Sequence, residues 1–134
     1  IFQSFNLLPS MTALENVNLP NQISGALIDD KKGIELLKSV GLKNRLNHYP
    51  HQLSGGEQQR VAIARSLITS PEILIADEPT GNLDKKNSEE VMKLIFKLQS
   101  DFASTLILVT HDETIAKQCN EIIKLDNGLI IKDE

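Results

Sequence analysis

Two short apolar runs constrain the fold of this chain more than any other feature of its sequence. Residues 73–76 and 105–109 are apolar at nearly every position, so both faces of each predicted strand are apolar. Strands of this kind are typical of parallel sheets, whose two faces are both covered by other elements. Asp84 can cap a helix between them, which gives the strand, helix and strand crossover that parallel strands require. The apolar face of that helix carries Val91, Leu94, Ile95 and Leu98.

Before the first run, capping signals and apolar spacing predict several helices. Thr12 and Glu15 have capping-box spacing, which predicts a short helix over residues 12–17 that ends before Pro20. A loop is predicted over residues 21–30, and a helix over residues 31–40, with Ile34, Leu37 and Val40 on one face and Gly41 as its stop.

A further short helix is predicted over residues 44–49, ended by Pro50. Ser54 and Glu57 then form a second capping box. The helix that they open carries Val61, Ala64, Leu67 and Ile68 on one side and stops before Pro71.

At the two ends of the chain, shorter strands are expected. Residues 1–3 look like the tail of a strand. After the second apolar run, a helix is predicted over residues 112–119 and a strand over residues 122–125. Asn127 and Gly128 suit a type I′ turn, so residues 129–131 are predicted to return as a hairpin. The fold class is therefore α/β, with a helical insertion before Ser54.

Composition limits the choice of function. The chain has 134 residues, 40% of them hydrophobic, which is enough for one domain with a core but too little for two. A net charge of −4 gives no reason to expect a nucleic-acid partner, because phosphate backbones bind basic faces. The single cysteine, Cys119, predicts a reducing compartment and a buried, inert side chain. No stretch is long and apolar enough for a membrane helix, so any membrane connection is expected through another subunit.

Charged residues follow the two apolar runs, where ligands bind in open α/β sheets. Asp77 and Glu78 end the first run, and His111 follows the second. Mg²⁺ on nucleotide phosphates favours a carboxylate such as Asp77. Glu78 would then face the terminal phosphate as a base for the attacking water, with His111 bonded to a phosphate oxygen or to Glu78. The plainer alternative is that these residues merely cap strand ends, and His48 and His51 are interpreted as surface or packing residues.

A second group of candidates opens the best-defined helix. Ser54, Gly55 and Gly56 lie at its start, where free N–H groups and the helix dipole favour an anion. The glycines allow a phosphate to approach the backbone closely. Such a helix start alone is usually only a cap, so the prediction depends on the whole run from Leu53 to Arg65.

The two motifs together resemble the ATP-binding cassette (ABC) ATPases. Residues 53–60, Leu-Ser-Gly-Gly-Glu-Gln-Gln-Arg, are similar to the family's signature sequence, and residues 73–78, Ile-Leu-Ile-Ala-Asp-Glu, to its Walker B strand. Residues 81–84, Gly-Asn-Leu-Asp, resemble the D-loop, and His111 the switch histidine. Gln3 in Phe-Gln-Ser-Phe resembles the Q-loop glutamine. The resemblance covers nearly the whole chain, with its motifs in the expected order.

The resemblance implies an ATPase that uses ATP and Mg²⁺. It implies that Glu78 and His111 are catalytic and that Asp77 and Gln3 serve the metal. It also implies that the nucleotide is bound by the signature motif and by Gln3, with Asp84 at the seam between two domains paired head to tail. The residues that the resemblance implies for nucleotide binding, the seam residue included, are Gln3, Ser54, Gly55, Gly56, Glu57 and Asp84. A second ATPase domain and a transmembrane permease are the implied partners, at the cytoplasmic face of the inner membrane.

The family's phosphate loop, Gly-x-x-x-x-Gly-Lys-Ser/Thr, is absent from the sequence. We therefore expect a partial P-loop NTPase fold with a parallel sheet core, a helical subdomain and a C-terminal β-hairpin. The expected divisions are residues 1–11 with the Q-loop, 12–70 as the helical subdomain, and 71–134 as the core with Walker B, D-loop and switch histidine. These residues alone are expected to bind ATP poorly, hydrolyse none, and aggregate or pair with another chain.

Within the family, residues 7–9, 12–17 and 81–84 resemble the branch that releases lipoproteins or exports macrolides, and the cell-division member is also similar. A non-catalytic remnant that acts as an interaction module is the alternative. A DNA-repair or chromosome-structure ATPase fits less well, because about fifty residues of short helices, with no long coiled coil, join Gln3 to Ser54.

Overall fold

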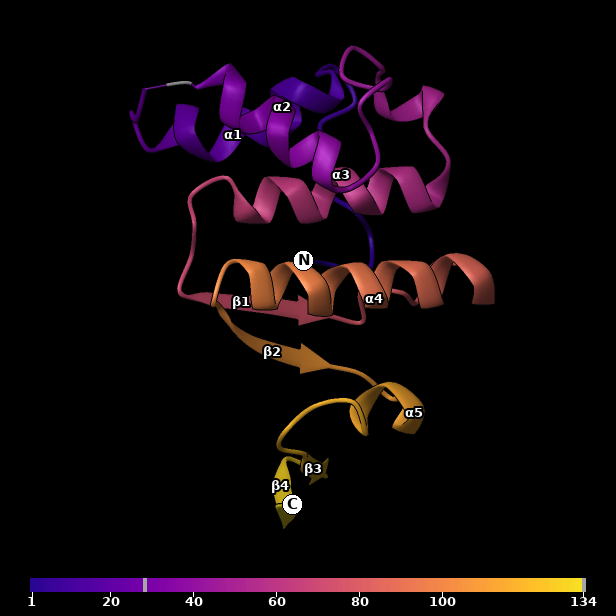
Figure 1. The fold of residues 1–134 in the computed structure, drawn as a ribbon. Helices are drawn as coiled ribbons and strands as arrows, with labels where there is room; N and C mark the ends of the chain where they lie inside the picture. The colour runs from indigo at the N-terminus through magenta and orange to yellow at the C-terminus, as the bar shows by residue number, and fades with distance from the viewer. Residues whose placement is uncertain (28, 134) are drawn as a thin grey trace.

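The computed structural model describes residues 1–27 and 29–133, and its elements stack in layers (Figure 1). Helices α1 and α2 lie over α3, and α4 and the parallel strands lie beneath α3. A small hairpin lies at the end farthest from α1. The helices are α1 (Ala13–Ile23), α2 (Asp30–Ser39), the 3₁₀ turn η1 (Pro50–Gln52), α3 (Gly55–Leu67), α4 (Lys85–Asp101) and α5 (Glu113–Ala116). The strands are β1 (Ile73–Asp77), β2 (Thr105–Val109), β3 (Ile123–Asp126) and β4 (Leu129–Asp133).

The parallel pair β1 and β2 confirms the predicted crossover. Ile73 lies opposite Thr105 and Asp77 opposite Val109, with α4 as the connection. The carboxyl ends of both strands therefore meet at one edge. The first residues of the chain run beside β1, since Phe2 forms a parallel bridge with Asp77 and the Asp77 N–H donates to the Ile1 carbonyl at 2.9 Å.

The core lies between α3 and the elements above and below it. Leu37 of α2, Ile63 of α3 and Ile95 of α4 are completely buried, and Leu74 of β1 joins the same cluster. Burying one such side chain stabilises the fold by about 1.5–3 kcal/mol. The apolar faces predicted for these helices are thus the faces that form the core.

Helix α1 is longer than predicted. Its capping box of Thr12 and Glu15 is present, but the helix continues through Pro20 to Ile23. Packing of its buried residues against α2 and α3 overrides the loss of one backbone hydrogen bond at the proline. The predicted loop after it is therefore shorter, and Ile28 in that loop lies outside the described residues.

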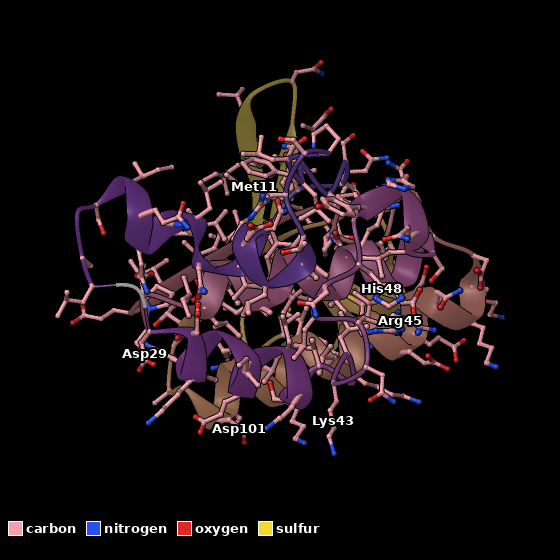
Figure 2. The ribbon with its side chains drawn as sticks, turned by 90° about the horizontal axis from the view of Figure 1, so that it is seen from above. Met11, Asp29, Lys43, Arg45, His48 and Asp101 are labelled. Carbon is pink, nitrogen blue, oxygen red and sulfur yellow. The ribbon has the colours of Figure 1, made fainter. Side chains whose placement is uncertain are left out.

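The predicted helix over residues 44–49 is wrong. The segment forms successive turns, in which the Arg45 N–H donates to Leu42 and the His48 N–H to Arg45. The carbonyls of Leu46 and His48 accept hydrogen bonds from the first N–H groups of α1, at 3.0 and 2.8 Å. The turns thus supply acceptors to N–H groups that the start of a helix leaves without intrahelical partners. Viewed from above, Arg45 and His48 lie side by side, across the molecule from Asp29 (Figure 2).

The prediction that both faces of β1 and β2 are buried is also wrong for the described residues. Leu74 and Ala76 are buried, but Ile73, Ile75, Ile107 and Val109 are each about half exposed, at 48–56%. The helices cover only one face of the pair. The other face is also apolar, but no element in the described part of the chain buries it.

The C-terminal hairpin follows its prediction closely. Asn127 and Gly128 both have positive φ, 48° and 78°, as a type I′ turn requires. Strand β4 is longer than predicted, whereas α5 is shorter than the helix predicted over residues 112–119. Within the described ranges, no helix combines the length and the apolarity needed to cross a bilayer.

Candidate functional site

The carboxyl ends of β1 and β2 bring Glu78 and His111 into direct contact. Oε1 of Glu78 lies 2.7 Å from Nδ1 of His111 and also accepts the His111 backbone N–H at 3.0 Å. The Glu78 N–H in turn donates to the carbonyl of Val109 at 3.0 Å. The strand register therefore places the two predicted catalytic residues together.

The contact changes the protonation of His111. Its hydrogen bond with Glu78, assisted by the carboxylate charge, raises the pKa of His111 above its ordinary 6.5. The imidazole is 84% exposed and the Glu78 side chain 25% exposed, so both can be reached from solvent. Both contacts use the same carboxylate oxygen of Glu78. The second oxygen is not used by them and can accept a proton from a water molecule.

Glu78 has an unusual backbone conformation. Its φ is +44°, a region that residues other than glycine rarely adopt. Its carbonyl accepts the N–H of Gly81 at 3.0 Å, which closes a turn directly after β1. Such conformations persist where the surroundings hold them, and they occur often at functional sites.

Asp77 and Gln3 lie on neighbouring backbone segments at the same edge. Phe2 pairs with Asp77, so Gln3 follows directly past the end of β1, and both Asp77 and Gln3 are exposed. The described residues contain no cluster of three or more His, Cys, Asp or Glu side chains that could hold a metal ion by themselves. Mg²⁺ in nucleotide sites needs only one or two protein oxygens beside phosphates and water, so Asp77 and Gln3 fit it.

The side chain of Gln3 is held by the loop after Glu78. Its Nε2 donates to Oδ1 of Asn82 at 3.3 Å, and Nδ2 of Asn82 donates to the Gln3 carbonyl at 3.0 Å. Gly81 lies against the same side chain, because a Cβ there would approach Nε2 of Gln3 to 2.6 Å. The Asn82 contact uses the amide nitrogen of Gln3, whereas a cation would bind the amide oxygen.

The start of α3 forms the predicted capping box. Oγ of Ser54 accepts the Glu57 N–H at 3.2 Å, and Oε2 of Glu57 accepts the Ser54 N–H at 2.8 Å. Arg45 donates from Nε to the other oxygen of Glu57 at 3.0 Å. The backbone hydrogen bond from Ser54, followed by the Arg45 contacts, lowers the pKa of Glu57. Glu57 therefore fixes the helix start as an ionised carboxylate.

Gly55 and Gly56 pack against the start of α4. A Cβ on Gly56 would lie 2.7 Å from Oδ1 of Asn87, and one on Gly55 would contact Leu83 at 3.5 Å. Asn87 is itself bonded to Asp84, the N-cap of α4, whose pKa is lowered by these bonds. The structure thus brings Gly55, Gly56 and Asp84 together.

The candidate residues form two groups rather than one. Within the part of the chain that the structure describes, no hydrogen bond joins the Ser54 to Gly56 turn to Glu78 or His111. Glu78 and His111 instead line a cleft of about 700 Å³ between the strand ends, α4 and α5. The loop of residues 79–84 connects the two groups along the chain.

Comparison with known proteins decides the family. Residues 1–81 match the family described as ABC transporter. The chain belongs to the ABC transporter family. The α/β fold with a parallel sheet and the family resemblance predicted from sequence are both confirmed.

Several proteins of known sequence or structure resemble this ABC transporter chain. It is 50% identical to the macrolide export ATP-binding/permease protein MacB of Chlorobium luteolum, covering 100% of this chain and 20% of that protein. It is 48% identical to the uncharacterized ABC transporter ATP-binding protein YbbA of Escherichia coli K12, covering 96% of this chain and 57% of that protein. The solved structure of the ATP-binding cassette MJ0796, dimeric and bound to ADP and Pi, is 45% identical with a TM-score of 0.83, covering 99% of this chain and 61% of that one. The chain therefore spans about a fifth to three fifths of these relatives.

Sequence reasoning gave no individual role to three residues that contact segments of the candidate site or lie buried beside them. Asn82 holds Gln3, Arg65 donates to the carbonyls of Phe5 and Asn6 at 2.9 and 2.6 Å, and Gln59 is completely buried. For Gln59 the sequence holds a signal. It shares one helical face with Gly56 and Ile63, so it is a polar residue among residues that face the core.

Proposed function

We propose that the protein carrying this chain is an ATP-hydrolysing subunit of a transporter, in which Glu78 and His111 act on the terminal phosphate. The observation that carries the proposal is the contact of 2.7 Å between Glu78 and His111 at the ends of parallel strands in an ABC transporter chain. The ABC family membership supports ATP as the nucleotide, and MJ0796 was solved with ADP and Pi.

In the proposed reaction, Glu78 accepts a proton from water through its second carboxylate oxygen. The water oxygen forms a bond to the γ-phosphorus, the bond from that phosphorus to the β,γ-bridging oxygen breaks, and ADP and phosphate leave. His111 holds Glu78 in place and can donate a hydrogen bond to a phosphate oxygen. Mg²⁺, held by Asp77 and Gln3, would neutralise phosphate charge.

The second group of residues is proposed to act across a dimer. Ser54, Gly55, Gly56 and Glu57 present the start of α3, with its N–H groups and dipole, to nucleotide on a second ABC domain. Asp84, packed beside Gly56 through Asn87, would lie at the seam. The separation of this group from Glu78 and His111, together with the dimeric state of MJ0796, supports a head-to-tail pair.

A transmembrane permease is the other proposed partner. The similarity to MacB, whose name combines macrolide export, ATP-binding and permease functions, supports coupling of ATP hydrolysis to export. Lipoprotein release is the other process that the sequence resemblance implies. The protein would then lie peripherally at the cytoplasmic face of the inner membrane.

The test is ATP hydrolysis by the full-length protein with Glu78→Gln. Loss of the base should lower kcat by about 10²–10⁴-fold, the range typical of general base removal. Glu72→Gln is the matched control, because Glu72 is exposed just before the opposite end of β1 and should leave kcat unchanged. A Glu78→Gln variant with wild-type kcat would exclude this role. A wild-type protein that binds its permease without hydrolysing ATP would favour an interaction module.

A further inference from the structure

A buried amide on α3 connects the segments that carry Gln3 and Glu78. Nε2 of Gln59 donates to the carbonyl of Pro79 at 2.5 Å and to the carbonyl of Phe2 at 3.3 Å. Pro79 follows Glu78 directly, and Phe2 directly precedes Gln3. One nitrogen atom therefore holds the backbone beside both residues.

The Pro79 contact acts where the backbone needs support. Glu78 has a φ of +44°, which must be held by its surroundings. The Glu78 N–H and carbonyl are bonded to Val109 and Gly81, and the Gln59 amide fixes the next carbonyl along the chain. Without Gln59, this buried carbonyl would lose its donor, and the turn that directs the Glu78 carboxylate would lose one of its supports.

Helix α3 holds the Gln3 segment from both sides. Gln59 bonds the carbonyl before Gln3, and Arg65 bonds the carbonyls of Phe5 and Asn6 after it. The same helix begins at the Ser54 capping box. A rigid helix thus links the start of α3 to both Gln3 and Glu78.

The other polar atom of the Gln59 side chain has no such partner in the part of the chain that the structure describes. Oε1 of Gln59 is buried and has no hydrogen-bond partner among the described residues. An unpaired buried acceptor costs free energy, and what offsets that cost is the pair of hydrogen bonds that Nε2 donates to carbonyls an apolar side chain could not bond. The donor on Nε2 supplies a reason for an amide there.

We infer that Gln59 is a positioning residue that fixes Gln3 and Glu78 relative to the start of α3. It acts through the backbone of Phe2 and Pro79 and contacts neither nucleotide nor the attacking water. The inference rests on the proposed ATPase function of Glu78 and Gln3.

The experiment compares Gln59→Met with Asn18→Leu in the full-length protein. Methionine keeps the length of glutamine but removes the donor. Asn18 is the matched control, because it is also buried with an unpaired oxygen, and its Nδ2 bonds Asp30 in the helical layer at 2.7 Å. Misplacement of reacting groups predicts a kcat about 10–100-fold lower for Gln59→Met with unchanged KM for ATP. Asn18→Leu should leave both constants unchanged at a temperature where all variants are folded.

A second readout does not depend on activity. In an NMR titration, Gln59→Met should move the pKa of His111 back toward 6.5, because Glu78 shifts away from the imidazole, and Asn18→Leu should not. Wild-type kcat and an unmoved His111 in Gln59→Met would overturn the inference, as would equal effects of both variants. If the wild type hydrolyses no ATP, the proposed function fails, and the titration still decides the inference. Gln59→Asn, which is too short to reach both carbonyls, replaces Gln59→Met if that variant does not fold.

Discussion

The helical region, α1 to α3, and the strand region, from β1 to β4, use their apolar residues differently. Leu37 and Ile63 in the helical region are fully buried, whereas Ile75 and Ile107 in the strand region are 56% and 48% exposed. A helix needs to cover one apolar stripe, and neighbouring helices in the chain can do so. A strand with two apolar faces needs a layer on each side.

The residues of the candidate site lie where these regions meet. Glu78 and His111 belong to the strand ends, Ser54 to Gly56 belong to α3, and Gln59 connects the two regions. The side chains proposed as catalytic are thus placed by strand register, and their backbone is supported from the helical region.

The largest expected effect tests the contrast in burial. In the 134-residue chain, Ile63→Ala should lower the free energy of unfolding by about 2–5 kcal/mol, because it removes a completely buried side chain. Ile75→Ala, the same change on the open face of β1, should cost roughly 0.5 kcal/mol or less. Urea unfolding followed by circular dichroism measures both.

Equal losses of stability for the two variants would contradict this difference in burial. They would mean that the open face of β1 is covered in solution, for example by another copy of the chain. Repeating the measurement at several protein concentrations separates this outcome from an error in the burial of Ile63, because covering by a second copy depends on concentration.

Local signals account for what could be predicted from the sequence. Thr12, Ser54 and Asp84 each cap the helix that they were expected to open, because a cap depends on residues three positions apart. The residue types Asn127 and Gly128 were as reliable a signal for the hairpin turn. The ends of β1 and β2 were predicted as well, so Glu78 and His111 could be expected to meet.

Features set by distant contacts could not be predicted. Pro20 lies inside α1 because of packing against α2 and α3, and residues 44–49 form turns whose carbonyls bond the first turn of α1, more than thirty positions away. The amide contacts of Gln59 and Asn82 join residues 20 to 79 positions apart. No local pattern encodes partners at such separations.

A smaller effect is expected from helix caps in the two regions. Thr12→Ala should cost about 1 kcal/mol of global stability, because it breaks the capping box of α1, whose residues form part of the core. Asp112→Ala removes the cap of α5, which has no buried residue, so it should loosen α5 alone. Unfolding measures the first, and hydrogen exchange at Thr114 and Ile115 the second. A global loss in Asp112→Ala matching that in Thr12→Ala would show that α5 is part of the cooperative unit.

The smallest effect concerns the exposed pair at the strand ends. The pKa of His111 is raised by its hydrogen bond with Glu78 and by the Glu78 charge. The pair therefore contributes its full stabilisation of the fold below the unfolded pKa of about 6.5. That contribution is lost as pH rises through the folded pKa of His111. The effect on stability should be small and should shrink with added salt, because the imidazole is exposed and screened.

An NMR titration of His111 tests its contact with Glu78 directly. Wild-type His111 should titrate above 6.5, and Glu78→Gln should return its pKa toward that value, because the variant removes the negative charge that favours the protonated imidazole. Glu113→Gln is the control, since Glu113 pairs with Lys124 rather than with His111. If Glu78→Gln leaves the titration unchanged, the strand ends do not hold these side chains together in solution. The strand region would then supply only a scaffold, and the organisation of the site would have to come from α3.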